Sequence, residues 1–100
     1  MISINVKFMD GNVKSLTVSG HANYDDVGKD IVCAGVSAVV TGGVNALDKY
    51  EKYVKCEVDN GVVSYEVLEV EHDSQIVLKT ILTQLETIEE AYKKYVKIYR

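Results

Sequence analysis

Two turn dipeptides, Asp10-Gly11 and Asn60-Gly61, each lie between segments in which apolar and polar side chains alternate. Alternation with a period of two is typical of a strand with one buried face. Asp-Gly and Asn-Gly are strong hairpin signals, because the central residues of a tight hairpin turn take a positive φ. These patterns constrain the chain to fold around two β-hairpins.

The register of the first hairpin depends on where its turn closes. A strict two-residue turn at Asp10-Gly11 pairs Val6 with Ser15. A three-residue loop instead pairs Val6 with Leu16. Only the second register buries matched apolar side chains on one face, so we predict a bulged hairpin with that pairing.

The second hairpin has a clearer turn, because Asn60-Gly61 favours a two-residue type I′ turn. Its register places six side chains on one face: Val54, Cys56, Val58, Val63, Tyr65 and Val67. Since Cys56 falls on this apolar stripe, we expect its thiol to pack rather than to react.

A core helix is expected between the hairpins, from about Ile31 to about Tyr50 or Tyr53. Its apolar positions are Val32, Val36, Val39, Val40, Val44 and Leu47. The segment also contains Gly35, Gly42 and Gly43. Each glycine costs a helix roughly 1 kcal/mol relative to alanine. Their presence indicates close packing against a neighbouring backbone, or a kink near residues 42–43, and a badly formed helix is the alternative.

A second helix is expected after an N-cap at Asp73 or Ser74. Its apolar side chains recur at spacings of three and four: Leu78, Ile81, Leu82, Leu85, Ile88, Tyr92 and Tyr95. Four cations lie toward its expected C-terminus: Lys93, Lys94, Lys97 and Arg100. The negative end of the helix dipole favours positive charge at that place.

The element order is therefore strand, strand, helix, strand, strand, helix. It predicts a two-layer α+β domain over residues 1–100, with a four-stranded, mainly antiparallel sheet and both helices on one face. The order of the strands within the sheet does not follow from the pattern.

Composition excludes several classes of function. The net charge of −4 disfavours a general nucleic-acid binder, which needs a basic face, and suits a basic peptide partner better. Apolar runs are short and interrupted by charges, so we expect a cytoplasmic protein with no membrane-spanning segment. Two cysteines in a chain without a secretion signal are expected to be free thiols. No Cys-x-x-Cys or Cys/His cluster has the spacing of metal ligands, so a structural zinc is not expected.

One pair of residues is suited to covalent catalysis. His21 should lie at the end of the second strand, where Gly20 allows a sharp change of direction. Asp30 fits an N-cap, which places Cys33 in the first helical turn, where unpaired N–H groups and the helix dipole favour a thiolate. We expect the backbone N–H groups near Cys33 to face a substrate carbonyl. Ser37 lies one helical turn further on the same face.

Each of these residues also has a structural interpretation, because a histidine at a strand end or a cysteine in a helical turn often only packs. His72 shares no motif with either cysteine, and we leave it out of the site. Asp25 and Asp26 are adjacent carboxylates that point apart, so no metal is predicted. The connection from Gly20 to Asp30 has the length and composition of a substrate-gating lid or of plain disorder.

At these positions the chain resembles a known family. Gly20-His21-Ala22, Gly28, Asp30, Cys33-Ala34 and Ser37 match the pattern of the ribosomal-processing cysteine proteases called Prp. The match extends over the whole chain in length and in element order. The resemblance implies a small α+β homodimer that removes a short N-terminal extension from bacterial large-subunit ribosomal protein twenty-seven.

Carried over by position, the resemblance implies that Cys33 is the nucleophile and His21 the general base, without a cofactor. Asp30 is then an accessory acidic residue and Ser37 a further site residue. The resemblance also implies cleavage after an aromatic residue in an extended segment, and a hydrophobic pocket beside the first helix. It further implies that the loop from Tyr24 to Lys29 moves when substrate binds.

Two other classes of function remain open from the residues. One is a non-catalytic, ribosome- or translation-associated module that binds a basic peptide through its acidic surface. The other is a structural dimer module without a site. The dimer module is suggested by five tyrosines: Tyr50, Tyr53, Tyr92, Tyr95 and Tyr99. They fit a dimer surface or the cover of a small core.

Overall fold

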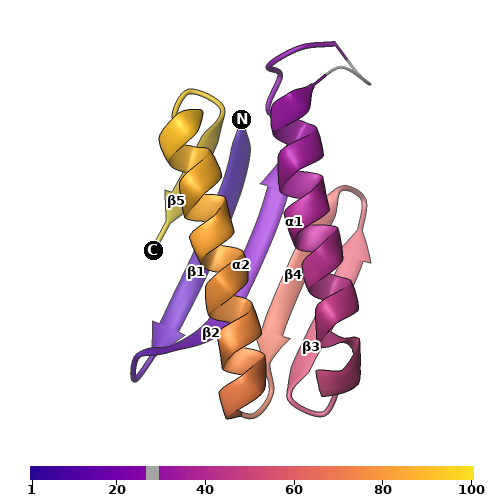
Figure 1. Cartoon of the computed structure of the whole chain (residues 1–100), viewed down its shortest axis with the longest axis vertical. Helices are drawn as coiled ribbons and strands as arrows, with labels where there is room; N and C mark the ends of the chain where they lie inside the picture. Colours follow the sequence, from indigo (N-terminus) through magenta and orange to yellow (C-terminus); the bar gives the residue numbers. More distant parts are fainter. Residues whose placement is uncertain (27–29) are drawn as a thin grey trace.

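The computed structural model describes residues 1–26 and 30–100, so Gly28 and Lys29 of the predicted loop lie outside the described residues. Its elements are β1 (Ile2–Met9), β2 (Asn12–Gly20), α1 (Ile31–Leu47), a 3-10 turn η1 (Asp48–Tyr50), β3 (Val54–Asp59), β4 (Val62–Val67), α2 (His72–Ala91) and β5 (Val96–Tyr99). The strands form one sheet in the order β3-β4-β2-β1-β5. Both helices cover the same face of this sheet, as predicted (Figure 1).

The register predicted for the first hairpin is confirmed, because Val6 pairs with Leu16. The extra residue does not lie in the turn, however. The turn is the two-residue Asp10-Gly11, with φ of 51° and 78°. Lys14 is the extra residue, because Lys7 pairs with Ser15 and the next residue of β1 pairs with Val13. A bulge within β2 therefore sets the apolar face of the hairpin.

The second hairpin is confirmed in both turn and register. Asn60 and Gly61 have φ of 46° and 76°, as a type I′ turn requires. Cys56 pairs with Tyr65, and the Tyr65 hydroxyl donates a hydrogen bond to the Val40 carbonyl of α1. This hairpin thereby anchors the first helix to the sheet.

The prediction of a four-stranded sheet is wrong, because the chain ends in a fifth strand. β5 pairs in parallel with β1, so the sheet is mixed. Val96 and Ile98 are buried while the residues between and after them are exposed, which is the alternation of a half-buried strand. The Ile2 N–H donates to the Tyr95 carbonyl at 2.8 Å and begins this pairing. The far terminus of the chain thus covers the outer edge of β1.

The second helix ends earlier than predicted, at Ala91, and begins slightly earlier, at His72. α2 ends at Ala91, and the Tyr92 N–H closes the last turn on the carbonyls of Ile88 and Glu89. The four cations expected at its C-terminus therefore lie beyond the helix, in the connection, in β5 and at the last residue.

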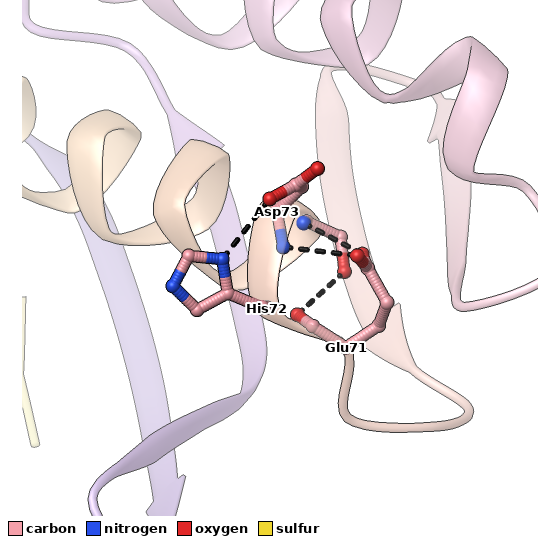
Figure 2. Close-up of polar contacts among 4 residues, drawn as sticks. Glu71, His72 and Asp73 are labelled. Carbon is pink, nitrogen blue, oxygen red and sulfur yellow. Dashed lines mark hydrogen bonds and ion pairs between the residues drawn. The ribbon is translucent and has the colours of Figure 1, made fainter.

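The N-cap of α2 is Glu71, and not Asp73 or Ser74 as predicted. Its carboxylate accepts the N–H groups of Ser74 at 2.8 Å and of Asp73 at 3.0 Å (Figure 2). A glutamate reaches these donors from one residue before the helix, which leaves the two predicted caps inside the first turn.

Gly43 shows why the first helix contains glycine. A Cβ atom there would lie 2.5 Å from the Ile81 side chain and 2.9 Å from the Tyr65 hydroxyl. The helix is continuous through this position, so close packing of α1 on α2, and not a kink, accounts for the residue.

The segment Ile31–Tyr50 is long and apolar enough to cross a membrane by length and composition. The core helix of a soluble protein passes the same test. One face of α1 packs into the core through Val32, Val36 and Leu47, and a single helix of this length and composition is weak evidence for a membrane span.

The tyrosines do not form one cluster. Tyr50 and Tyr53 follow α1, whereas Tyr92 and Tyr95 follow α2, at the other end of the sheet (Figure 1). All four pack partly buried against the core, which favours a structural role for them. Tyr99, on β5, is exposed.

Candidate active site

Asp30 caps the first helix as predicted. Its Oδ1 atom accepts the N–H groups of Val32 and Cys33, each at 3.0 Å. Cys33 therefore occupies the third position of the helix, with its side chain half-buried.

The same contacts correct the expectation about oxyanion donors. The N–H groups of Val32 and Cys33 are bonded to the Asp30 carboxylate, and the Ala34 N–H donates to the Asp30 carbonyl at 3.0 Å. These three groups are not free to face a substrate carbonyl. Capping and oxyanion binding compete for the same donors, and in this structure the cap holds them.

Gly20 allows the chain to leave β2 beside the thiol. Its φ of +92° suits glycine, and a Cβ atom there would clash with the Met1 carbonyl. The chain then turns so that the Ala22 N–H donates to Sγ of Cys33 at 3.3 Å. The structure therefore brings the segment that contains His21 against Cys33.

Two hollows meet at this point. The larger, of about 510 Å³, is lined by all four predicted site residues together with Asn23, Asp25 and Ala34. The smaller, of about 190 Å³, shares His21, Cys33 and Ser37 with the first. Its other walls are mainly apolar and come from β1, β2, α1 and β4, including Ile2, Val18, Val36, Val40 and Val63. An exposed histidine and a half-buried thiol thus lie where the two hollows share their lining.

Asp30 also organises the loop in front of the helix. Its Oδ2 atom accepts the N–H of Tyr24 at 2.9 Å and, more weakly, that of Asp25 at 3.5 Å. Desolvation alone would raise the pKa of this carboxyl. Hydrogen bonds to the carboxylate outweigh this effect of desolvation and hold the pKa below its usual range. They come from the N–H groups of Cys33, Tyr24 and Asp25 and from the Cys33 side chain. An ionised Asp30 is therefore bonded to both the helix and the loop.

The residues excluded from the site lie elsewhere. Cys56 is half-buried on β3, and burial raises the pKa of its thiol. His72 begins α2, at the opposite end of the molecule from the start of α1 (Figure 1). In residues 1–26 and 30–100, no group of three or more His, Cys, Asp or Glu side chains is arranged to hold a metal ion.

The sequence matches a known protein family over nearly its whole length. The model of the family described as cysteine protease Prp matches residues 1–97. The chain belongs to the Prp family of cysteine proteases.

Named relatives and a solved structure agree with this assignment. A ribosomal processing cysteine protease Prp from Staphylococcus aureus is 34% identical over 103 residues, which cover 98% of this chain and 97% of that protein. One from Bacillus subtilis is 35% identical over 97 residues, covering 89% and 87%. The crystal structure of Prp from S. aureus with a covalently linked product peptide superposes with a TM-score of 0.89, at 34% identity and coverage of 98% and 97%.

In this Prp-family chain, sequence reasoning missed two contributors to the site. The first is the backbone N–H of Ala22, which bonds the thiol. The second is Asn23, which lines the larger hollow with a φ of 55°. Asparagine adopts left-handed backbone angles more readily than most residues, so Asn23 could have indicated a turn two residues after His21.

Proposed function

We propose that this protein is a site-specific cysteine endopeptidase that removes the N-terminal extension of bacterial large-subunit ribosomal protein twenty-seven. Cys33 is the nucleophile and His21 the general base. The observation that carries the proposal is the contact of the segment after β2 with Sγ of Cys33, where two hollows meet. Ribosomal processing is the stated activity of the relatives from S. aureus and B. subtilis.

The reaction proceeds in two steps. The Cys33 sulfur attacks the scissile carbonyl after its proton passes to His21, and the tetrahedral intermediate collapses as His21 protonates the leaving amine. Water then attacks the thioester as His21 accepts one of its protons, and the tetrahedral intermediate collapses with cleavage of the C–S bond. His21 returns that proton to the sulfur, and the carboxylic acid product ionises by releasing its own proton to solvent. The Ala22 N–H donates to Sγ at 3.3 Å, so the loop that contains His21 makes a direct polar contact with the attacking atom.

Asp30 and Ser37 support this dyad in different ways. Asp30 bonds the first turn of α1 and the backbone at Tyr24, so it fixes the loop relative to the nucleophile. Ser37 lines both hollows, one helical turn after Cys33, and is placed to contact a bound peptide.

The smaller hollow is the place for the side chain that precedes the scissile bond. Its apolar walls suit the aromatic residue after which the family cleaves, and it opens directly at Cys33. The larger hollow is bordered by the carboxylates of Asp25 and Asp30, which suits a basic segment of a peptide. An extended substrate would thus lie across the thiol from one hollow to the other.

We further propose that the protein is a single domain, works in the cytoplasm as a homodimer, and binds neither nucleic acid nor a membrane. The net charge of −4 supports the last two points. Sedimentation equilibrium of the purified protein tests the dimer, because a monomer mass at micromolar concentration would contradict it.

A non-catalytic peptide-binding module is the second candidate function. One observation favours it: the N–H groups at the start of α1 are bonded to Asp30 and do not form a ready oxyanion site. On this alternative, a ribosome- or translation-associated protein would hold a basic peptide in the larger hollow without cleaving it.

One experiment separates the two. The wild type, Cys33→Ala and the matched control Cys56→Ala are incubated with the extended ribosomal protein, and product masses are read. We expect the wild type and Cys56→Ala to remove the extension and Cys33→Ala to leave it intact. Stable binding without cleavage by all three would support the binding module, and cleavage by Cys33→Ala would contradict the assigned nucleophile.

A further inference from the structure

Tyr24 connects the loop after His21 to the far end of the second helix. Its ring meets the ring of Tyr92 edge-on, with centroids 5.7 Å apart and an interplanar angle of 85°. It meets the ring of Tyr95 in the same manner, at 5.0 Å and 78°. Edge-to-face contacts at these distances are favourable aromatic geometries.

The two receiving tyrosines are held by the fold. The Tyr92 carbonyl accepts the N–H groups of Tyr95 at 2.9 Å and of Val96 at 3.1 Å. The Tyr95 carbonyl accepts the Ile2 N–H, and both rings pack partly buried against the core. They therefore form a fixed platform where α2, β5 and β1 meet.

The backbone of Tyr24 is fixed as well, because its N–H donates to Oδ2 of Asp30 at 2.9 Å. At the other end of the same stretch, Gly20 is the last residue of β2 and pairs with Ile2 of β1. Only three residues separate these two anchored points, and they include His21 and Ala22, whose N–H bonds the thiol. Movement at Tyr24 is thus transmitted to His21 across a very short segment.

We propose that Tyr24 is a positioning residue, which by docking its ring on Tyr92 and Tyr95 holds His21 beside Cys33. This inference rests on the proposed function for the role of His21. Tyr24 does not line either of the two hollows at the thiol, so it acts through the loop and not by touching substrate. Tyr24 is 41% exposed and does not belong to the core cluster, so removing its side chain leaves the core intact.

The first test compares Tyr24→Ala, Tyr24→Phe and the matched control Tyr99→Ala, whose side chain is 47% exposed on β5. The substrate is a peptide that spans the cleavage site. For Tyr24→Ala we expect kcat to fall about tenfold or more with KM nearly unchanged, because the loss of two aromatic contacts releases the loop. Tyr24→Phe keeps the ring and should retain activity, and Tyr99→Ala should match the wild type. Thermal melts verify that each variant folds.

A second measurement needs no substrate. Iodoacetamide alkylation of Cys33 is followed by peptide mass across pH, and Tyr24→Ala should react more slowly than the wild type while Tyr24→Phe does not. If Tyr24→Ala cleaves and alkylates like the wild type, the inference is overturned and the proposed function stands. If the wild type does not cleave, the proposed function is wrong, and the alkylation rates alone decide whether Tyr24 orders this loop.

The platform itself is tested with Tyr95→Leu, which keeps an apolar side chain on the core but removes the ring. We expect this variant to lose activity, and the double variant with Tyr24→Ala to be no worse than Tyr24→Ala alone. Such non-additivity indicates that two residues act through one contact. Losses that multiply would show that the two tyrosines act independently, which would overturn the docking.

Discussion

The two helices begin in the same way and yet only one beginning forms a candidate active site. Asp30 caps α1 and Glu71 caps α2, and each carboxylate accepts two N–H groups of its own first turn. Figure 1 places these two starts at opposite ends of the molecule. In both cases bonds to the ionised form lower the pKa of the capping carboxyl.

The difference lies in how far each carboxylate reaches. The contacts around Glu71 are all local: its side chain bonds the N–H groups of Asp73 and Ser74, and its carbonyl accepts the Ser74 hydroxyl (Figure 2). Within the described residues, the His72 side chain bonds its neighbour Asp73 alone, at 3.0 Å, and it is 83% exposed.

Asp30, by contrast, uses its second oxygen to hold a separate segment, at Tyr24 and Asp25. That segment follows His21 and bonds the thiol of Cys33 through the Ala22 N–H. A helix start that is capped by a carboxylate and has a histidine nearby is therefore an ordinary structural feature, because both helices have one. It becomes a candidate site where the cap also fixes a second segment against a nucleophile.

The largest expected effect distinguishes the two histidines. His21→Ala should lower kcat/KM for the spanning peptide by about a hundredfold or more, since general acid–base catalysis contributes about 10²–10⁴-fold. His72→Ala, at the other helix start, should leave it within about twofold, because that side chain is exposed and bonds its neighbour Asp73. Equal losses in both variants would remove the distinction between the two helix starts.

The next effect concerns the two thiols. At pH 7 iodoacetamide should modify Cys33 about tenfold faster than Cys56, as peptide mass spectrometry of the wild type can measure. Cys33 has the helix start and the Ala22 N–H beside its sulfur, whereas burial raises the pKa of the Cys56 thiol. Similar, slow rates would instead indicate two packing cysteines.

Local signals predicted most of the fold. Asn60-Gly61 adopts the expected turn, and both registers follow from matching apolar faces, although Asp10-Gly11 closes a two-residue turn where a three-residue loop was predicted. The Asp30 cap was predictable for the same reason, since it depends on a few adjacent residues. The contact of the segment after β2 with Cys33 joins residues eleven apart, and the residues alone left it as a hypothesis beside a structural interpretation.

The fifth strand was not predictable from local pattern. Tyr92 and Tyr95 continue the helical spacing of the residues before them, so periodicity alone extends the helix. The helix ends at Ala91 because Val96 and Ile98 gain burial and a ladder of hydrogen bonds beside β1, at the other end of the chain. The contact of Tyr24 with Tyr92 and Tyr95 depends on that same return of the chain.

The two caps can be compared directly by removing each. Asp30→Ala and Glu71→Ala should each lower the melting temperature by a few degrees, because each leaves two N–H groups of a helix start without their acceptor. Only Asp30→Ala should also slow cleavage, since it releases the backbone at Tyr24. Circular dichroism melts and peptide cleavage measure the two effects. Equal activity of the two variants would show that Asp30 does no more than cap its helix.

The smallest expected effect is the pH dependence of these stabilities. Because the folded-state pKa of both carboxyls is lowered, each contributes stability that is fully present above the ordinary carboxyl pKa of about 4 and is lost as pH falls through the folded value. The melting-temperature deficit of Asp30→Asn or Glu71→Gln relative to the wild type should therefore be constant at neutral pH and shrink in acid. A deficit that persists in strong acid would mean that the caps stabilise by shape and hydrogen bonding without regard to charge. In that case Asp30 would hold the loop equally well when protonated, and acid would not release the segment that contains His21.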